Sequence, residues 1–198
     1  NNVNDIEFNY ISGEKSNNIF GSIEKSHGEP SNIKNQTRNT LVMAMNKKEE
    51  RYNITFYLSY LSRWPDLFCL QESSNGIIMG YAEGRGKEWH GHVTAITVAP
   101  EYRRIGLADR MMQLLENVSE NVYNGYFVDL FVRVSNIIAV GMYRKFGYTV
   151  YRRVTGYYSS GDNSEEDAYD MRKPLKRDVN RESVVENGEL NYVRPEDL

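Results

Sequence analysis

The residues best suited to hold an anion lie in one short turn between a predicted strand, 89–98, and a predicted helix, 108–121. The turn carries Arg103, Arg104 and Gly106. Backbone N–H groups at a helix start have no internal partners, and the helix dipole adds partial positive charge there. Because Gly106 has no Cβ, the backbone can approach a ligand closely. The pattern favours phosphate binding. The alternative is an ordinary strand-to-helix connection with two solvated arginines.

A tyrosine and a histidine could take part in proton transfer or polar recognition. Tyr143 follows Asn136 by seven residues in a helix predicted over 136–146, so both share one face after about two turns. A phenol with a pKa near 10 is a poor base but a usable acid. His92 and Thr94 share one face of their strand and can donate together to a carboxylate or an amide.

Each of these side chains also has an ordinary structural interpretation. Tyr143 could be a core tyrosine, and His92 a strand histidine bonded to a neighbouring backbone group. Asn136 could be the N-cap of its helix, a role that does not exclude ligand binding. The residue types alone leave these alternatives open.

Composition bounds the class of protein. The chain has 198 residues, 40% hydrophobic content and a formal net charge of -3, which suffices for a core and gives no reason to expect nucleic acid. No stretch is apolar enough to suggest a membrane partner or a leader peptide. The single cysteine, Cys69, lies in an apolar stretch and is predicted to be a buried thiol in a reducing compartment. No metal-ligand spacing and no Ser-His-Asp arrangement is present.

The chain is predicted to contain a polar, flexible segment at 1–50, one domain at 51–175 and a polar surface tail at 176–198. Hairpin strands come first and then alternate with helices, which predicts an α/β (α+β) fold with a mixed sheet flanked by helices. Besides the elements above, we expect a helix at 53–63, a turn at 84–87, strands at 67–72, 77–83, 126–132, 148–154 and 168–172, and a turn led by Gly156 that carries Tyr157 and Tyr158.

Two motifs resemble the GNAT family of acetyltransferases. One is Arg103-x-x-Gly106-x-Ala108, and the other is Asn136-Ile137-Ile138-Ala139 followed by Met142-Tyr143 and Phe146-Gly147-Tyr148. Longer stretches are similar to the catalytic subunits of NatB-type N-terminal acetyltransferases: 88–95, 126–136, 156–159 and 167–173. The resemblance covers about residues 52–198.

The resemblance implies a GNAT fold, with a mostly antiparallel sheet whose central strands splay apart, and acetyl-CoA as cosubstrate without a metal. It places cofactor contacts at Arg103, Arg104, Ile105, Gly106, Leu107, Ala108, Asn136 and Tyr143. The Val98 backbone N–H would face the acetyl oxygen, and Tyr143 would be the general acid. Peptide substrate would be bound by Glu50, Tyr52, His92, Thr94, Tyr157 and Tyr158.

The resemblance further implies acetyl transfer to the α-amine of proteins that begin Met-Asp, Met-Glu, Met-Asn or Met-Gln. The chain would act in the cytoplasm with a large helical auxiliary subunit, on nascent chains at the ribosome. Since an α-amine has a pKa near 8, no strong base is needed. The alternatives are a GNAT enzyme acting on another amine and a catalytically impaired CoA-binding module.

Two departures from the family pattern stand out. Gly141 occupies a position where the family usually has Asn, so we expect a loss of about 1 kcal/mol in helix propensity and weaker cofactor binding. Residues 5–48 would be an insertion before the second helix of the family fold, and this insertion ends beside Glu50 and Tyr52.

Overall fold

The computed structural model describes residues 55, 59, 62–72, 78–86, 89–159 and 165–198. The chain divides into two compact units, Asn1–Gly84 with Ala95–Met112, and Arg85–Thr94 with Gln113–Leu198. The predicted segment 1–50, most of the predicted helix 53–63, and residues Glu50 and Tyr52 lie outside the described residues.

The first unit contains an antiparallel strand pair and the start of a long helix. Strand β1 (Phe68–Glu72) follows a 3-10 helix at Pro65–Leu67 and pairs with β2 (Ile78–Gly86). Both strands were predicted. The turn predicted at 84–87 is wrong for 84–86, which continue β2, because glycine can also be extended and prolong a strand.

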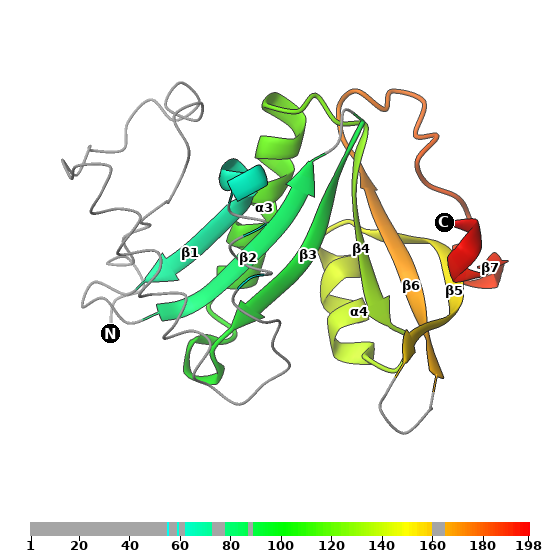
Figure 1. Ribbon diagram of the computed structural model, residues 1–198, viewed down its shortest axis with the longest axis horizontal. Coiled ribbons are helices and arrows are strands. Elements are labelled where there is room, and N and C mark those ends of the chain that lie inside the picture. The colour runs from blue at the N-terminus through cyan, green and yellow to red at the C-terminus, as the bar shows by residue number, and fades with distance from the viewer. Residues whose placement is uncertain (1–54, 56–58, 60–61, 73–77, 87–88, 160–164) are drawn as a thin grey trace. The chain divides into compact units, whose positions relative to one another are not determined.

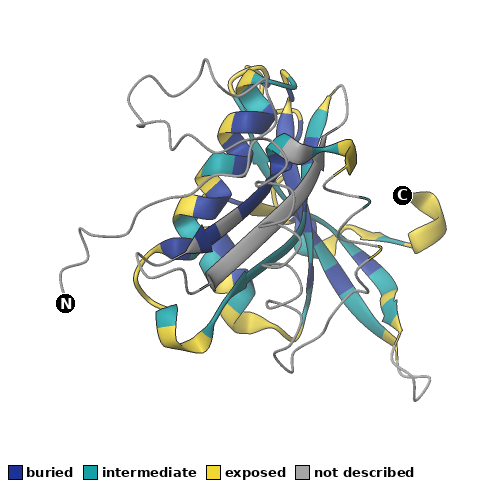
Figure 2. Cartoon of the chain, turned by 60° about the vertical axis from the view of Figure 1, so that its left-hand side comes forward, coloured by how far each residue is buried: buried dark blue, intermediate teal, exposed yellow. Residues whose placement is uncertain are grey.

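The chain then passes through β3 (His90–Val98) and a 3-10 helix at Pro100–Tyr102 to helix α3 (Leu107–Asn121). Almost fully buried apolar side chains of the first unit lie on its first 3-10 helix, on β1 and on α3. They include Cys69, which is confirmed as a buried thiol, together with Leu67, Phe68, Leu107, Met111 and Met112. Figure 2 shows buried and exposed positions alternating along α3, as its amphipathic sequence predicts.

The second unit is built on a mixed sheet. Five strands are hydrogen-bonded in the order β3-β4-β6-β5-β7, with β4 at Phe127–Arg133, β5 at Thr149–Ser159, β6 at Glu165–Pro174 and β7 at Tyr192–Val193. The start of β3 runs parallel to β4, and β6 runs antiparallel to both β4 and β5. The mixed sheet predicted from the order of elements is confirmed.

One face of β4 is covered by helices. Val128, Leu130 and Val132 point to this face and are buried, beneath the second half of α3 and helix α4 (Ile137–Lys145) (Figure 1). A Cβ on Gly91 would lie 2.1 Å from the Ser119 hydroxyl oxygen, so glycine is needed for α3 to pack this closely. The alternating residues Phe127, Asp129 and Phe131 point to the other face. That face therefore carries the polar and aromatic groups.

Strand β5 is longer than the predicted 148–154. It continues through Gly156, where a turn was predicted, to Ser159. Gly156 has φ +59°, and its N–H donates to Asp167 at 2.9 Å, while the pairing with β6 is irregular between Val154 and Tyr158. A bulge at a left-handed glycine bends the strand without ending it. It also places Tyr157 and Tyr158 on a bent part of the sheet.

The C-terminal tail contains a strand that the sequence did not predict. Strand β7 lies between 3-10 helices at Gly188–Leu190 and Pro195–Asp197 and runs parallel to β5. The Arg153 N–H donates to the Asn191 carbonyl at 2.8 Å. A Cβ on Gly188 would lie 2.0 Å from the Val150 carbonyl oxygen, so this glycine lets the tail lie against β5.

Candidate functional site

The backbone of the turn predicted to bind phosphate is left-handed at two positions. Arg104 and Gly106 both have positive φ, 67° and 85°. Arg103, Arg104, Ile105 and Gly106 are exposed, and the Arg103 Nε–H donates to the Val98 carbonyl at 3.1 Å. Turns with left-handed residues aim successive N–H groups into a concavity suited to an anion. The Arg103–Val98 bond fixes this turn to the end of β3.

The turn leads directly into α3, which begins with buried Leu107. The first N–H groups of a helix lack intrahelical acceptors and carry the positive end of its dipole. A Cβ built on Gly106 meets no atom within 4 Å, so the space over this backbone is open to a ligand. The predicted contacts from Arg103 to Ala108 thus fit a pyrophosphate, and their roles stay predictions.

Asn136 is the N-cap of α4. Its side-chain oxygen accepts the N–H of Ala139 at 3.1 Å, which confirms the structural interpretation. Its amide nitrogen makes no hydrogen bond to any described residue. The side chain is exposed, so the predicted contact with the arm of coenzyme A is compatible with the cap.

Tyr143 is a buried phenol near the end of α4. Its ring packs at a steep angle against Tyr148, with centroids 6.1 Å apart, and its hydroxyl makes no hydrogen bond to a described residue. Burial raises the pKa of Tyr143 to about 12. Tyr143 therefore keeps its proton at physiological pH, as a general acid must.

His92 lies beside a carboxylate that sequence reasoning gave no role. The His92 Nδ1 atom is 2.8 Å from Asp129 Oδ1, and both side chains are 10% exposed. Burial raises the pKa of Asp129, but the hydrogen bond and charge of His92, with His90 and Arg172, outweigh burial and hold that pKa below 3.8. Asp129 is therefore ionised and can only accept a hydrogen bond, so His92 Nδ1 carries the hydrogen.

An aromatic wall adjoins His92. Phe131 lies 5.8 Å from the His92 ring, and Tyr157 stacks on Phe131 with centroids 4.6 Å apart. Tyr158 meets Tyr157 edge to face, and the Arg133 guanidinium lies over its ring at 4.3 Å. The structure thus brings together His92 and both predicted substrate tyrosines.

Thr94 contributes an unused hydroxyl on the same strand. Its Oγ1 is buried and makes no hydrogen bond to any described residue. Buried hydroxyls are normally satisfied, so an exception suggests a ligand or water partner. His92 and Thr94 lie two residues apart on β3 and share one face, as predicted.

Asp129 is the functional candidate that sequence reasoning missed. The available signal was a single carboxylate within the apolar strand Phe127–Arg133. A buried charge is costly unless it is paired, so such a carboxylate implies a cationic or hydrogen-bonding neighbour. The partner could not be named without the register that sets His92 opposite Asp129.

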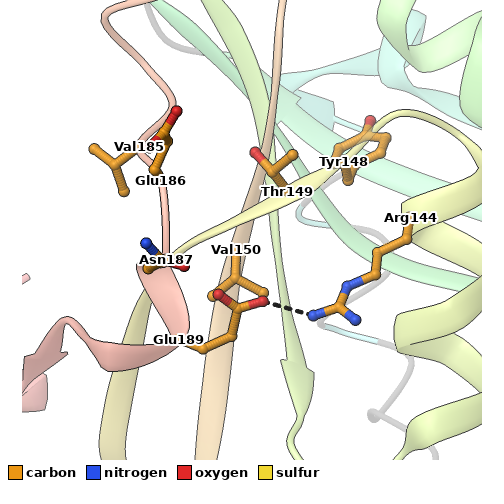
Figure 3. A pocket seen from close by; sticks show the side chains of 8 residues that line it. All are labelled: Arg144, Tyr148, Thr149, Val150, Val185, Glu186, Asn187 and Glu189. Carbon is orange, nitrogen blue, oxygen red and sulfur yellow. Dashed lines mark hydrogen bonds and ion pairs between the residues drawn. The ribbon is translucent and has the colours of Figure 1, made fainter.

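A hollow of about 550 Å³ lies elsewhere in the second unit, between β5 and the tail (Figure 3). An ion pair of 2.6 Å between Arg144 and Glu189 crosses it. Its lining contains none of the predicted catalytic or substrate residues: Arg144, Tyr148, Thr149, Val150, Val185, Glu186, Asn187 and Glu189.

Two features are absent from the described residues. No helix in these parts of the chain is long and apolar enough to cross a membrane. No His, Cys, Asp and Glu side chains in the same parts gather into a group that could hold a metal ion.

Comparison with known proteins identifies the class. The family model described as "Acetyltransferase (GNAT) family" matches residues 35–148. The chain is 58% identical over 155 residues to the N-terminal acetyltransferase B complex catalytic subunit of Schizosaccharomyces pombe, covering 75% of this chain and 86% of that protein. It is 60% identical over 140 residues to N-alpha-acetyltransferase 20 of Dictyostelium discoideum, covering 69% of this chain and 79% of that protein.

Solved structures show similarity to the same group of acetyltransferases. Chaetomium thermophilum Naa20 in complex with a bisubstrate analogue is 40% identical, with a TM-score of 0.70, and the match covers 85% of this chain and 95% of that one. A NatB acetyltransferase complex bound to a bisubstrate inhibitor contains a chain that is also 40% identical, with a TM-score of 0.66 and coverage of 81% and 95%.

The chain therefore belongs to the GNAT acetyltransferase family and, within it, to the group of NatB catalytic subunits. It is an N-terminal α-acetyltransferase, and acetyl-CoA is its cosubstrate. The GNAT fold expected from the two motifs is confirmed.

Proposed function

We propose that this enzyme acetylates the α-amine of proteins that begin Met-Asp, Met-Glu, Met-Asn or Met-Gln. One observation carries the choice of substrate. His92 Nε2 and Thr94 Oγ1 share one face of β3, and neither makes a hydrogen bond to a described residue. The Thr94 hydroxyl can donate to an oxygen of an acidic or amide side chain, and Nε2 can donate to such an oxygen when it carries a hydrogen or accept the N–H of an amide when it does not.

The chemistry needs little more than positioning and one acid. The amine nitrogen bonds to the acetyl carbon while the carbon–sulfur bond of acetyl-CoA breaks. Because an α-amine has a pKa near 8, a fraction is already neutral, and water can take the proton it loses. The thiolate takes the proton of Tyr143, whose hydroxyl makes no hydrogen bond to a described residue and stays neutral.

We also propose that the chain works in the cytoplasm at the ribosome, with a large auxiliary subunit. Similarity to a chain of the solved NatB complex supports the auxiliary subunit. Purification of the tagged chain from cells should recover a stoichiometric large partner, and sedimentation should place the complex with ribosomes. Recovery of the chain alone in the soluble fraction would contradict both proposals.

The decisive assay compares three peptides, Met-Asp, Met-Leu and Ser-Ala, with and without the auxiliary subunit. We expect acetylation of Met-Asp and little of the other two. Preference for Ser-Ala or Met-Leu would assign another N-terminal specificity. Binding of acetyl-CoA without turnover of any peptide would show that this chain is a catalytically impaired binding module.

A further inference from the structure

Asp129 has one hydrogen-bonding partner among the described residues, His92. The two residues are cross-strand neighbours of β3 and β4, and Arg172 of β6 lies opposite Asp129 on the other side. Arg172 directs its guanidinium to Asp170, at 3.0 and 3.2 Å. The Asp129 carboxylate is therefore left for the histidine.

The bond to Asp129 decides which way the imidazole faces. Since an ionised carboxylate only accepts, it takes the hydrogen on Nδ1 and leaves Nε2 for another ligand. Phe131 packs beside the ring at 5.8 Å and is itself covered by Tyr157. The ring is thus held by a hydrogen bond at one edge and an aromatic contact beside it, while Nε2 makes no bond to a described residue.

We propose that Asp129 is a positioning residue that sets the second-residue preference of the enzyme, because it holds His92 with Nε2 directed at the side chain of the substrate's second residue. This inference rests on the proposed function, in which His92 and Thr94 read the second residue. Asp129 touches neither substrate nor cosubstrate in this role and acts through His92.

The role has a different consequence for acidic and amide substrates. To bind a carboxylate, Nε2 must carry a hydrogen while Nδ1 keeps its own, so the ring bridges two carboxylates. An Asn or Gln side chain both donates and accepts, so it can meet Nε2 in either state. Loss of the Asp129 charge should therefore weaken Met-Asp and Met-Glu binding more than Met-Asn and Met-Gln binding.

The test uses the full-length chain with its auxiliary subunit and compares Asp129→Asn with wild type on Met-Asp and Met-Asn peptides. We expect KM for Met-Asp to rise about 10- to 100-fold, the size expected for a charge-assisted hydrogen bond. The rise for Met-Asn should be smaller, and kcat should change little on either peptide.

A double variant separates positioning from general structural damage. The double variant, which combines His92→Ala with Asp129→Asn, should have no higher KM for Met-Asp than His92→Ala alone. The reason is that the carboxylate acts through the imidazole, which both variants lack. Asp178→Asn is the matched control, since Asp178 is as buried as Asp129 (6% against 7% exposed) and is bonded to Ser183 instead. It should keep the wild-type KM on both peptides.

Several outcomes would overturn the inference. One is an unchanged KM in Asp129→Asn, and another is a double variant in which the increases in KM of the two single variants multiply. A third is an equal fall of kcat on every peptide, which would make the pair a general base. If Asp129→Asn does not fold, Asp129→Ser takes its place, and failure of both to fold while His92→Ala folds would assign a purely structural role. Absence of Met-Asp turnover by the wild type would instead refute the proposed function.

Discussion

Tyr143 combines two properties that an acid catalyst needs. The ring is buried, so its pKa rises to about 12 and the neutral phenol persists over the whole working range of pH. The hydroxyl makes no hydrogen bond to a described residue, so its proton is not committed to any group in that part of the chain. Tyr148, its neighbour, is the opposite case, because its hydroxyl donates to Glu116 at 3.1 Å and Lys173 binds the same carboxylate at 2.6 Å.

Replacement of Tyr143 by Phe should lower kcat by about 10²- to 10⁴-fold, the usual contribution of a general acid. Melting temperature should change little, because no hydrogen bond to a described residue is lost. Steady-state kinetics on a Met-Asp peptide and a thermal melt of the same preparation provide the two measurements. A variant with near wild-type kcat would show that Tyr143 is only a core tyrosine.

Tyr148→Phe is the control for this experiment and should behave in the reverse way. It removes the buried hydrogen bond to Glu116, so the free energy of unfolding should fall by about 1–3 kcal/mol. At a temperature where the variant is folded, kcat should remain close to wild type. A large loss of kcat here would mean that the aromatic pair acts as one unit.

At the scale of elements, α4 depends on its first residue. Asn136 caps the helix through its oxygen and leaves its amide nitrogen for a ligand. Asn136→Ala should lower the free energy of unfolding by about 1 kcal/mol. Asn136→Asp should keep the cap and the stability, but it places a negative charge where coenzyme A is predicted to bind.

The two Asn136 variants therefore distinguish the cap from cofactor contact. If Asn136 binds coenzyme A, Asn136→Asp should raise KM for acetyl-CoA at unchanged melting temperature. Thermal melts and an acetyl-CoA titration of both variants decide the question. An unchanged KM in both variants would leave Asn136 with the cap alone.

Gly141 lies in the same helix, at a position where the family usually has Asn. No steric constraint among the described residues requires glycine there. The residue is exposed, and a Cβ added there meets nothing within 4 Å. Gly141→Ala should raise the free energy of unfolding by about 0.5–1 kcal/mol because alanine loses less backbone entropy in a helix. A urea unfolding curve provides the measurement, and a fall in stability would reveal a contact that the glycine makes room for.

Periodicity and turn residues predicted most of the described elements, including strands β1–β6 and helices α3 and α4. The left-handed Gly156 bulge was misread as a turn, because a glycine signals a positive φ without saying whether the strand resumes. Strand β7 has two residues and exists only through its pairing with β5, so no local pattern marks it. The Asp129–His92 pair was missed for the same reason, since it depends on strand register.

At the scale of the whole molecule, several carboxylates are more acidic in the fold than in the free chain. Asp178 in the tail is one example. Burial raises the pKa of Asp178, but hydrogen bonds from the Ser183 side chain and from the backbone N–H groups of Ser183 and Glu182 outweigh it, so the net pKa lies below 3.8. The hydrogen bonds of Asp129 and Asp167 lower their pKa values in the same direction, against burial.

The lower pKa of Asp178 in the folded chain predicts a loss of stability in acid. The unfolded chain protonates Asp178 near its ordinary pKa of 3.8, whereas the folded chain protonates it only at lower pH. Its contribution is therefore fully present above 3.8 and is lost as pH falls through the folded value. We expect Asp178→Asn to cost about 1–3 kcal/mol at neutral pH, because an amide cannot accept every bond that the carboxylate accepts. Melting curves from neutral pH to below pH 3.8 should show the variant and the wild type converging, and a constant gap would refute the linkage.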